Sequence, residues 1–190
     1  MGRTREYDEA TALSGAMHAF RRKGFAAVSV RELEKATRLK IASIYNSFGD
    51  KAGLFEAAFA HYNQTVLGAR IAQHAPASAG LGGLRKLFLT LLEEPRGESF
   101  GCLITNSAVE FGGAESVPGG VAAGLTTLAQ TFTQRLAATG LPAQRASDLA
   151  LRLLALYQGT LVLIRAGWDK RALARYLDDE FDRLEQDHDA

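Results

Sequence analysis

The apolar residues of this 190-residue chain recur with the period of an α-helix almost from end to end, and the alternation typical of a β-strand is nearly absent. Breaks rich in glycine and proline separate the helical stretches. The spacing predicts helices over residues 6–23, 29–37, 40–47, 51–71, 84–93, 99–111, 119–139, 143–166 and 170–186. The sequence therefore predicts an all-α fold of about nine helices.

Helix boundary signals are clearest in the first fifty residues. Gly24 follows a run of basic residues at the end of the first stretch, as expected for a helix C-terminus. Ser29 and Glu32 have the spacing of a capping box, and Asp50 is placed to cap the fourth helix. Two short helices joined by a tight turn and resting on a preceding helix follow the plan of a helix-turn-helix motif.

Charge is distributed unevenly along the chain. Residues 1–51 carry ten Lys and Arg against six Asp and Glu, whereas residues 52–190 carry twelve against fifteen. The overall net charge of +1 therefore conceals a basic first segment and a slightly acidic remainder. This asymmetry indicates that the first segment faces a polyanion, with chance scatter of surface charge as the alternative.

The helix predicted over 40–47 has an apolar face and a polar face. Ile41, Ile44 and Phe48, spaced three and four apart, would seat it on its neighbours. The other face carries polar side chains that can meet base edges in a major groove. These are Lys40, Ser43, Asn46 and Ser47.

Three further side chains could hold the phosphate backbone. Tyr45 could donate its hydroxyl proton to a phosphate, and Ser29 and Lys51 each lie at the start of a helix, where anions bind. The alternatives are a packing role for Tyr45 and an ordinary solvated lysine at position 51. Taken together, the pattern predicts binding to double-stranded DNA.

At these residues the chain resembles the DNA-binding domain of the tetracycline-repressor (TetR) family of bacterial transcription regulators. The resemblance covers about residues 5–60. It rests on Phe20 and Gly24-Phe25 at the end of the first helix and on two runs, Ser29-Val30-Arg31-Glu32-Leu33 and Ser43-Ile44-Tyr45-x-x-Phe48-Gly49-Asp50-Lys51-x-x-Leu54-Phe55. It implies a DNA-binding domain over 1–51 and a ligand-binding and dimerisation domain over 52–190. It also implies a ligand-responsive repressor that binds a near-palindromic operator as a homodimer and is released by a small-molecule inducer.

Three positions depart from the family pattern. Arg38 in the turn and Ala42 in the third helix replace glycines that are common there, and Lys40 replaces a capping serine. Arg38 must adopt a left-handed conformation or reshape the turn, because an L-residue is strained where glycine is not. Arg38 could also add a phosphate contact, so it joins the predicted DNA-binding residues.

The helix predicted over 143–166 is apolar nearly all round and must therefore be covered on every side. One flank can pack within the protomer and another against a partner, with the last helix supplying a second apolar stripe. We expect a two-fold four-helix interface, the alternative being a monomer with a large core. Two recognition helices about one DNA turn apart would then read a near-palindrome.

A polar stripe interrupts the helix predicted over 99–111. Cys102, Asn106 and Glu110 are spaced four apart and share one face. The stripe could tie helices together, with Glu110 meeting Arg152 or Arg165. Alternatively, it lines a ligand pocket. The other side chains predicted for that pocket are Phe59, Tyr62, Phe88, Leu92, Tyr157 and Gln158.

The pattern Gly101-Cys102-Leu103, followed seven residues later by Glu110, is similar to one in some TetR-type regulators, including the repressor of N-ethylmaleimide reductase, whose cysteine responds to electrophiles and oxidants. The similarity implies that Cys102 is a redox or electrophile switch, the alternative being an inert buried thiol. A helix that begins near Ser99 would place Cys102 in its first turn, where a thiolate is favoured.

Other classes of protein find less support in the sequence. The four histidines lack the spacing of metal ligands and Cys102 has no evident catalytic partner, so we expect no enzyme, metal or cofactor. A helical carrier or protein-interaction module without DNA binding is the remaining alternative. A single cysteine, the absence of an apolar run of ~18 residues and a polar N-terminus predict a cytoplasmic protein with no membrane partner.

Overall fold

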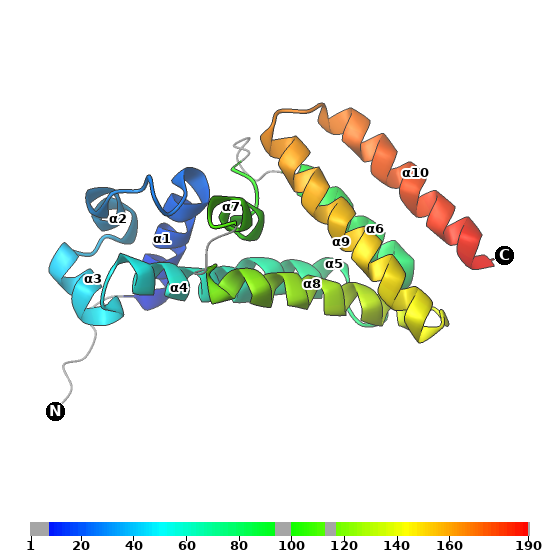
Figure 1. The fold of residues 1–190 in the computed structure, drawn as a ribbon, viewed down its shortest axis with the longest axis horizontal. Helices are drawn as coiled ribbons and strands as arrows, with labels where there is room; N and C mark the ends of the chain where they lie inside the picture. Colours follow the sequence, from blue (N-terminus) through cyan, green and yellow to red (C-terminus); the bar gives the residue numbers. More distant parts are fainter. Residues whose placement is uncertain (1–7, 94–99, 113–116, 190) are drawn as a thin grey trace. The chain divides into compact units, whose positions relative to one another are not determined.

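The computed structural model describes residues 8–93, 100–112 and 117–189 (Figure 1). All regular structure in these residues is helical, which confirms the predicted fold class. The α-helices are α1 (Glu9–Lys23), α2 (Val30–Thr37), α3 (Ile41–Phe48), α4 (Lys51–Tyr62), α5 (Ala69–His74), α6 (Gly80–Leu89), α7 (Leu103–Glu110), α8 (Gly119–Ala137), α9 (Ala143–Arg165) and α10 (Lys170–Asp189).

The stretch predicted as one helix over 51–71 contains an irregularity. A π-helical segment, Asn63–Gly68, joins α4 to α5, and a 3₁₀ turn, Thr90–Leu92, extends α6. Within the π-helical segment, Thr65 donates its hydroxyl proton to the carbonyl of His61 at 2.7 Å. With α4, the π-helix and α5 taken as one run, the described helical stretches correspond in order to those that the periodicity predicts, although the start of one of them differs.

The helix that carries Cys102 begins later than predicted. α7 begins at Leu103, and Cys102 is its N-cap residue. Gly101 has φ 71°, a left-handed conformation through which an α-helix does not continue. The prediction that Cys102 lies in the first helical turn is therefore wrong, and Ser99, the predicted start, lies outside the described residues.

The chain divides into two compact units that share helices. The N-terminal unit comprises Met1–Val66 and Cys102–Ala122, and the C-terminal unit comprises Leu67–Gly101 and Ala123–Ala190. The chain passes between them within the π-helix, between Gly101 and Cys102, and within α8. The functional division predicted at residue 51 stays a prediction.

The N-terminal unit is built on α1, which packs against both α2 and α4. Phe20, Leu33 and Leu54 contribute fully buried side chains to its core. Gly15 allows the backbones of α1 and α2 to approach closely, because a Cβ atom there would lie 1.9 Å from the carbonyl oxygen of Ala36. The helix-turn-helix is thus fixed to α1 by close backbone packing.

The C-terminal unit has an aromatic core contributed by four helices. The ring centroid of Phe88 on α6 lies 5.2 Å from those of Tyr157 on α9 and Phe181 on α10, and 5.6 Å from that of Phe132 on α8. Arg85 on α6 also forms ion pairs with Asp178 and Asp182 of α10. These contacts hold α10 against α6.

Among the described residues, α9 alone is long and apolar enough to cross a membrane by length and composition. The core helix of a soluble protein passes the same test. Tyr157, near the middle of α9, is buried in the aromatic core of the unit. Only a third of the apolar window in α9 is buried, so one flank of this helix packs in the unit and the rest is open.

Candidate nucleic-acid interface

The start of α2 is fixed by the predicted capping box. The Ser29 hydroxyl accepts from the Glu32 N–H at 3.3 Å, and the Glu32 carboxylate accepts from the Ser29 N–H at 2.9 Å. Lys23, in the last turn of α1, pairs with the same carboxylate. Hydrogen bonds from Lys23 and then from Ser29 lower the pKa of Glu32 to about 2. This confirms the predicted cap and joins it to the end of α1.

The turn between α2 and α3 has the conformation that its sequence requires. Arg38 adopts φ 60° and ψ 21°, the left-handed conformation expected where this residue stands in place of glycine. The hydroxyl of Thr37 donates to the carbonyl of Leu33 at 2.7 Å and accepts from the N–H of Leu39 at 3.2 Å. The buried hydroxyl of Thr37 therefore stabilises the turn, and the side chain of Arg38 remains exposed.

The N-terminus of α3 is capped by a residue that sequence reasoning did not identify. Lys40 is the N-cap residue and its side chain makes no capping bond. Instead, Glu34 on α2 accepts from the N–H of Ile41 at 2.8 Å across the turn. The only signal in the sequence is a carboxylate seven positions before the helix start, a spacing that becomes a contact only when the turn folds back.

The recognition helix α3 shows the two faces predicted for it. Ile44 is 1% exposed and anchors the helix, with Ile41 and Phe48 half-buried beside it. On the other face Tyr45 is 44% exposed, and Asn46 is exposed as well. The remaining polar residues of this face are the exposed Lys40 and the half-buried Ser43 and Ser47.

Lys51 is held at the start of α4. The side chain of Asp50 caps that helix by accepting from the Gly53 N–H at 2.7 Å, as predicted. The ammonium of Lys51 lies 4.7 Å from the centroid of the Phe25 ring, within cation–π range. The side chain is therefore positioned by Phe25 as well as by its helix.

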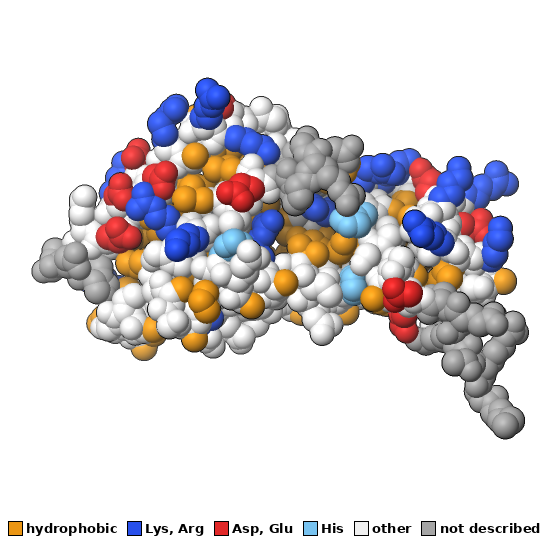
Figure 2. Space-filling model, turned by 180° about the vertical axis from the view of Figure 1, so that it is seen from behind, with side chains coloured by type: hydrophobic (Ala, Val, Ile, Leu, Met, Phe, Trp, Pro, Cys, Tyr) orange, Lys and Arg blue, Asp and Glu red, His pale blue; other side chains and the backbone are white. Residues whose placement is uncertain are grey.

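A basic hollow lies beside the turn. Its volume is about 470 Å³, and it is lined by Arg31, Glu34, Lys35, Arg38, Leu39 and Lys40. Figure 2 shows Lys and Arg side chains gathered over this end of the N-terminal unit. Arg31 and Lys35 were not among the predicted DNA-binding residues, although their spacing of four places both on one face of α2.

The side chains predicted to line a ligand pocket fall in both units. Phe59, Tyr62, Cys102, Asn106 and Glu110 belong to the N-terminal unit. Phe88, Leu92, Tyr157 and Gln158 belong to the C-terminal unit. Phe59, Phe88 and Tyr157 pack in aromatic clusters of their own unit, and Leu92 and Gln158 are half-buried.

The polar stripe of α7 makes contacts inside the N-terminal unit. Cys102 Sγ lies 3.1 Å from the hydroxyl of Tyr62, and both residues are buried. Asn106 donates to the carbonyl of Arg21, and Glu110 accepts from two main-chain N–H groups that follow α1. The stripe therefore ties α7 to the end of α1, through main-chain partners rather than the arginines suggested by the sequence.

Two buried polar atoms were not anticipated from the sequence. Ser107 Oγ and Asn63 Oδ1 have no hydrogen-bond partner within the described ranges. Asn63 begins the π-helix, a feature frequently found at functional sites. Sequence periodicity does not identify these oxygens, because whether a side-chain oxygen is buried without a hydrogen-bond partner depends on tertiary packing. Where the structure describes side chains, no group of His, Cys, Asp and Glu could hold a metal ion.

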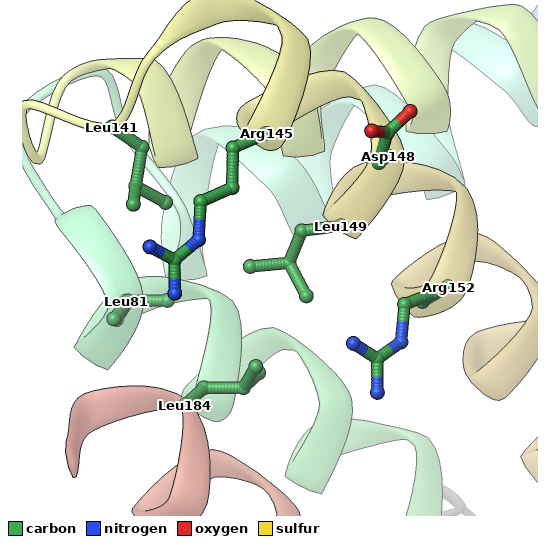
Figure 3. A pocket seen from close by; sticks show the side chains of 7 residues that line it. All are labelled: Leu81, Leu141, Arg145, Asp148, Leu149, Arg152 and Leu184. Carbon is green, nitrogen blue, oxygen red and sulfur yellow. The ribbon is translucent and has the colours of Figure 1, made fainter. Parts of the chain in front are cut away.

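A groove runs along α9 and α10 in the C-terminal unit. Arg145 and Arg152 lie on either side of Leu149 in its first part, which has a volume of about 110 Å³ (Figure 3). The other residues lining this part are Leu81, Leu141, Asp148 and Leu184. An adjoining hollow of about 290 Å³ shares three of these residues and extends to Tyr176 and Glu180. The exposed flank of α9 thus faces an open, partly apolar groove.

A capped helix-turn-helix with an exposed polar recognition helix, joined to a second helical unit, defines a DNA-binding transcription regulator. Comparison with known families agrees. Residues 12–58 match the family described as bacterial regulatory proteins, tetR family, and residues 83–178 match the C-terminal domain of LmrA/YxaF-like transcriptional regulators. The chain belongs to the TetR family of transcriptional regulators. This membership confirms the prediction of a DNA-binding regulator rather than an enzyme.

Individual proteins are similar to this chain in part of the sequence or in the fold. The HTH-type transcriptional repressor BdcR of Escherichia coli (strain K12) is 41% identical over 61 residues, a match that spans 32% of this chain and 31% of BdcR. A cysteine mutant of the TetR family regulator CifR, complexed with 26-bp double-strand operator DNA, is 25% identical with a TM-score of 0.78, covering 95% of this chain and 98% of that one. SCO4454 from Streptomyces coelicolor, 20% identical over 95% of each chain, has the same fold with a TM-score of 0.80.

Proposed function

We propose that this regulator is a cytoplasmic repressor that binds a near-palindromic operator as a homodimer and is released from it by a small-molecule inducer. The observation that carries the proposal is α3, which is anchored by buried Ile44 and exposes Tyr45 and Asn46. Ser43, Asn46, Ser47 and Lys40 would read base edges. Ser29, Arg38, Tyr45 and Lys51 would hold phosphates.

The homodimer is supported by the exposed flank of α9 and α10. Leu151 is 68% exposed, Val162 49% and Tyr176 48%, and removing apolar side chains from water is favourable when a partner covers them. A second copy of the chain would cover this flank through paired α9 and α10 helices. Two copies would also present two recognition helices to one operator.

The inducer is supported by the unpartnered Ser107 and Asn63 oxygens in the N-terminal unit and by the match to a regulator C-terminal domain. A buried polar atom without a partner costs free energy, and a ligand that donates a hydrogen bond would remove that cost. An inducer can release the operator only by binding the DNA-free conformation more tightly than the DNA-bound one.

For Cys102 we propose the chemistry of the N-ethylmaleimide-reductase repressor type, in which an electrophile or oxidant modifies the thiol. The support is the contact between Cys102 Sγ and the Tyr62 hydroxyl, because added bulk at a buried contact must displace the end of α4. Cys102→Ser would then abolish any loss of operator binding caused by a reactive aldehyde or peroxide. An unchanged response in that variant rules the switch out.

Selection of binding sites from random duplexes, followed by a footprint, tests the proposed function. We expect a near-palindromic site, bound with an affinity that falls steeply as salt concentration rises, since phosphate contacts release counterions. Tyr45→Ala and Lys51→Ala should weaken binding to all sequences, whereas Asn46→Ala and Ser43→Ala should change sequence preference. If no sequence is enriched and no salt-dependent binding to DNA is seen, the result would favour the alternative, a helical carrier or protein-interaction module without DNA binding.

A further inference from the structure

Glu110, the last residue of α7, holds the chain segment that leads into the helix-turn-helix. Its carboxylate accepts from the N–H of Phe25 at 2.8 Å and from the N–H of Ala26 at 2.7 Å. Both amides lie between α1 and α2, where no helical partner is available to them. Hydrogen bonds from amides to a charged acceptor are among the stronger ones in proteins.

The backbone beneath Glu110 is shaped for this contact. Gly24 has φ 82°, and a Cβ atom at that position would lie 2.8 Å from Glu110 Oε2. Glycine is therefore needed both for the conformation and for the approach of the carboxylate. One turn earlier in α7, Asn106 Nδ2 donates to the carbonyl of Arg21 at 3.0 Å. Two side chains of α7 thus hold the end of α1 and the segment after it.

Phe25 connects this contact to the DNA-facing surface. Its main-chain N–H is bound by Glu110, and its ring supports the ammonium of Lys51 at 4.7 Å. The ring also packs 5.1 Å from that of Phe55 and 5.5 Å from that of Phe111, which follows Glu110 in the chain. A shift of α7 would therefore move Phe25 and, with it, the cation at the start of α4.

We infer that Glu110 is a positioning residue for operator binding, acting through Phe25 on Lys51. The inference rests on the proposed function and gives the contacts through which α7 acts on the helix-turn-helix. Cys102 adjoins one end of α7 and Glu110 the other, about 12 Å apart along an eight-residue helix. A disturbance at the Cys102 end that moves α7 breaks the two hydrogen bonds that Glu110 accepts from the N–H groups of Phe25 and Ala26, and the operator is bound less tightly.

A double-mutant cycle between Glu110 and Lys51 tests the path. Operator affinity is measured by fluorescence anisotropy for the wild type, Glu110→Ala, Lys51→Ala and the double variant. We expect Glu110→Ala to weaken binding about two- to thirtyfold and to add nothing further once Lys51 is alanine. Glu56→Ala removes an exposed carboxylate from α4 and is the charge-matched control, for which no weakening is expected.

The result that overturns the inference is an equal loss from Glu110→Ala in the presence and absence of the Lys51 side chain, because a merely structural role gives additive effects. Unchanged affinity of a folded Glu110→Ala variant overturns it as well. If that variant does not fold, Glu110→Gln replaces it in the cycle, since glutamine keeps the size of the side chain but has one amide oxygen in place of the two carboxylate oxygens that accept from Phe25 and Ala26. A wild-type protein that binds no operator defeats the proposed function instead, so the two failures are distinguishable.

Discussion

Replacing Gly15 by alanine should destabilise the N-terminal unit, although alanine is the better helix former. In an unobstructed helix the change would stabilise the fold by about 1 kcal/mol. Here the new Cβ atom would lie 1.9 Å from the carbonyl oxygen of Ala36 and 2.6 Å from its carbonyl carbon. Both are backbone atoms of α2, so no side chain can rotate away, and α1 and α2 must separate by more than 1 Å.

The magnitude follows from these two opposing effects. Overpacking of a close helix contact costs about 1–3 kcal/mol and sometimes more, which outweighs the gain in helix propensity. For a chain of this length, each 1 kcal/mol lowers the melting temperature by about 2–4 °C. We therefore expect Gly15→Ala to melt several degrees below the wild type. Operator affinity should also fall, because α2 carries the Ser29 cap and the turn.

Thermal unfolding at one fixed protein concentration measures the effect, since dimerisation makes the melting temperature depend on concentration. Gly82→Ala is the matched control. A Cβ atom at Gly82 in α6 would meet nothing within 4 Å, so this variant should melt at or above the wild-type temperature. A Gly15→Ala protein as stable as the Gly82→Ala protein would refute the packing argument.

Three further predictions concern side chains. Tyr45→Ala should weaken operator binding uniformly and Asn46→Ala should relax preference at particular bases; identical preference profiles in a binding selection would contradict these roles. Because the pKa of Glu32 is lowered from 4.5 to about 2, its ionised carboxylate stabilises the fold at pH values above 4.5, and this stabilisation is lost as the pH falls toward about 2. Glu32→Gln should remove that part of the acid-unfolding profile, and an unchanged profile would count against it. Arg85 binds Asp178 at 2.8 Å and Asp182 at 2.6 Å, so Arg85→Met should lower the melting temperature by a few degrees at most, as expected for partly exposed pairs.

Local features of the helix-turn-helix could be predicted because they depend on residues close in sequence. The capping box of Ser29, the cap at Asp50 and the left-handed Arg38 each follow from side chains within three positions or from one backbone requirement. The exposed face of α3 follows in the same way from the spacing of Ile41 and Ile44. Here, the propensity of the segment and its tertiary packing favour the same structure.

Contacts between segments far apart in sequence could not be predicted. Glu110 was recognised as part of a polar stripe, yet its partners, the amides of Phe25 and Ala26, lie more than eighty positions away. Glu34 caps α3 only because the turn brings it back to Ile41. Amphipathic spacing shows that such a side chain needs a partner but does not identify the partner.

Irregular backbone also escaped prediction. The π-helix at Asn63–Gly68 interrupts a stretch whose apolar spacing is that of a plain α-helix. Likewise, α7 begins at Leu103 because Gly101 is left-handed, whereas apolar periodicity alone extended the helix to Ser99. Periodicity reports which residues share a face but is insensitive to an extra residue in one turn or to the conformation of a single glycine.

A structure of the protein bound to its selected operator would show whether α3 is the element that reads the DNA. We predict two copies of the chain with each α3 in a major groove, the two helices ~34 Å apart, Asn46 within hydrogen-bond distance of a base edge and Tyr45 at a phosphate. A complex in which another element enters the groove, and α3 lies away from the DNA, would contradict the account.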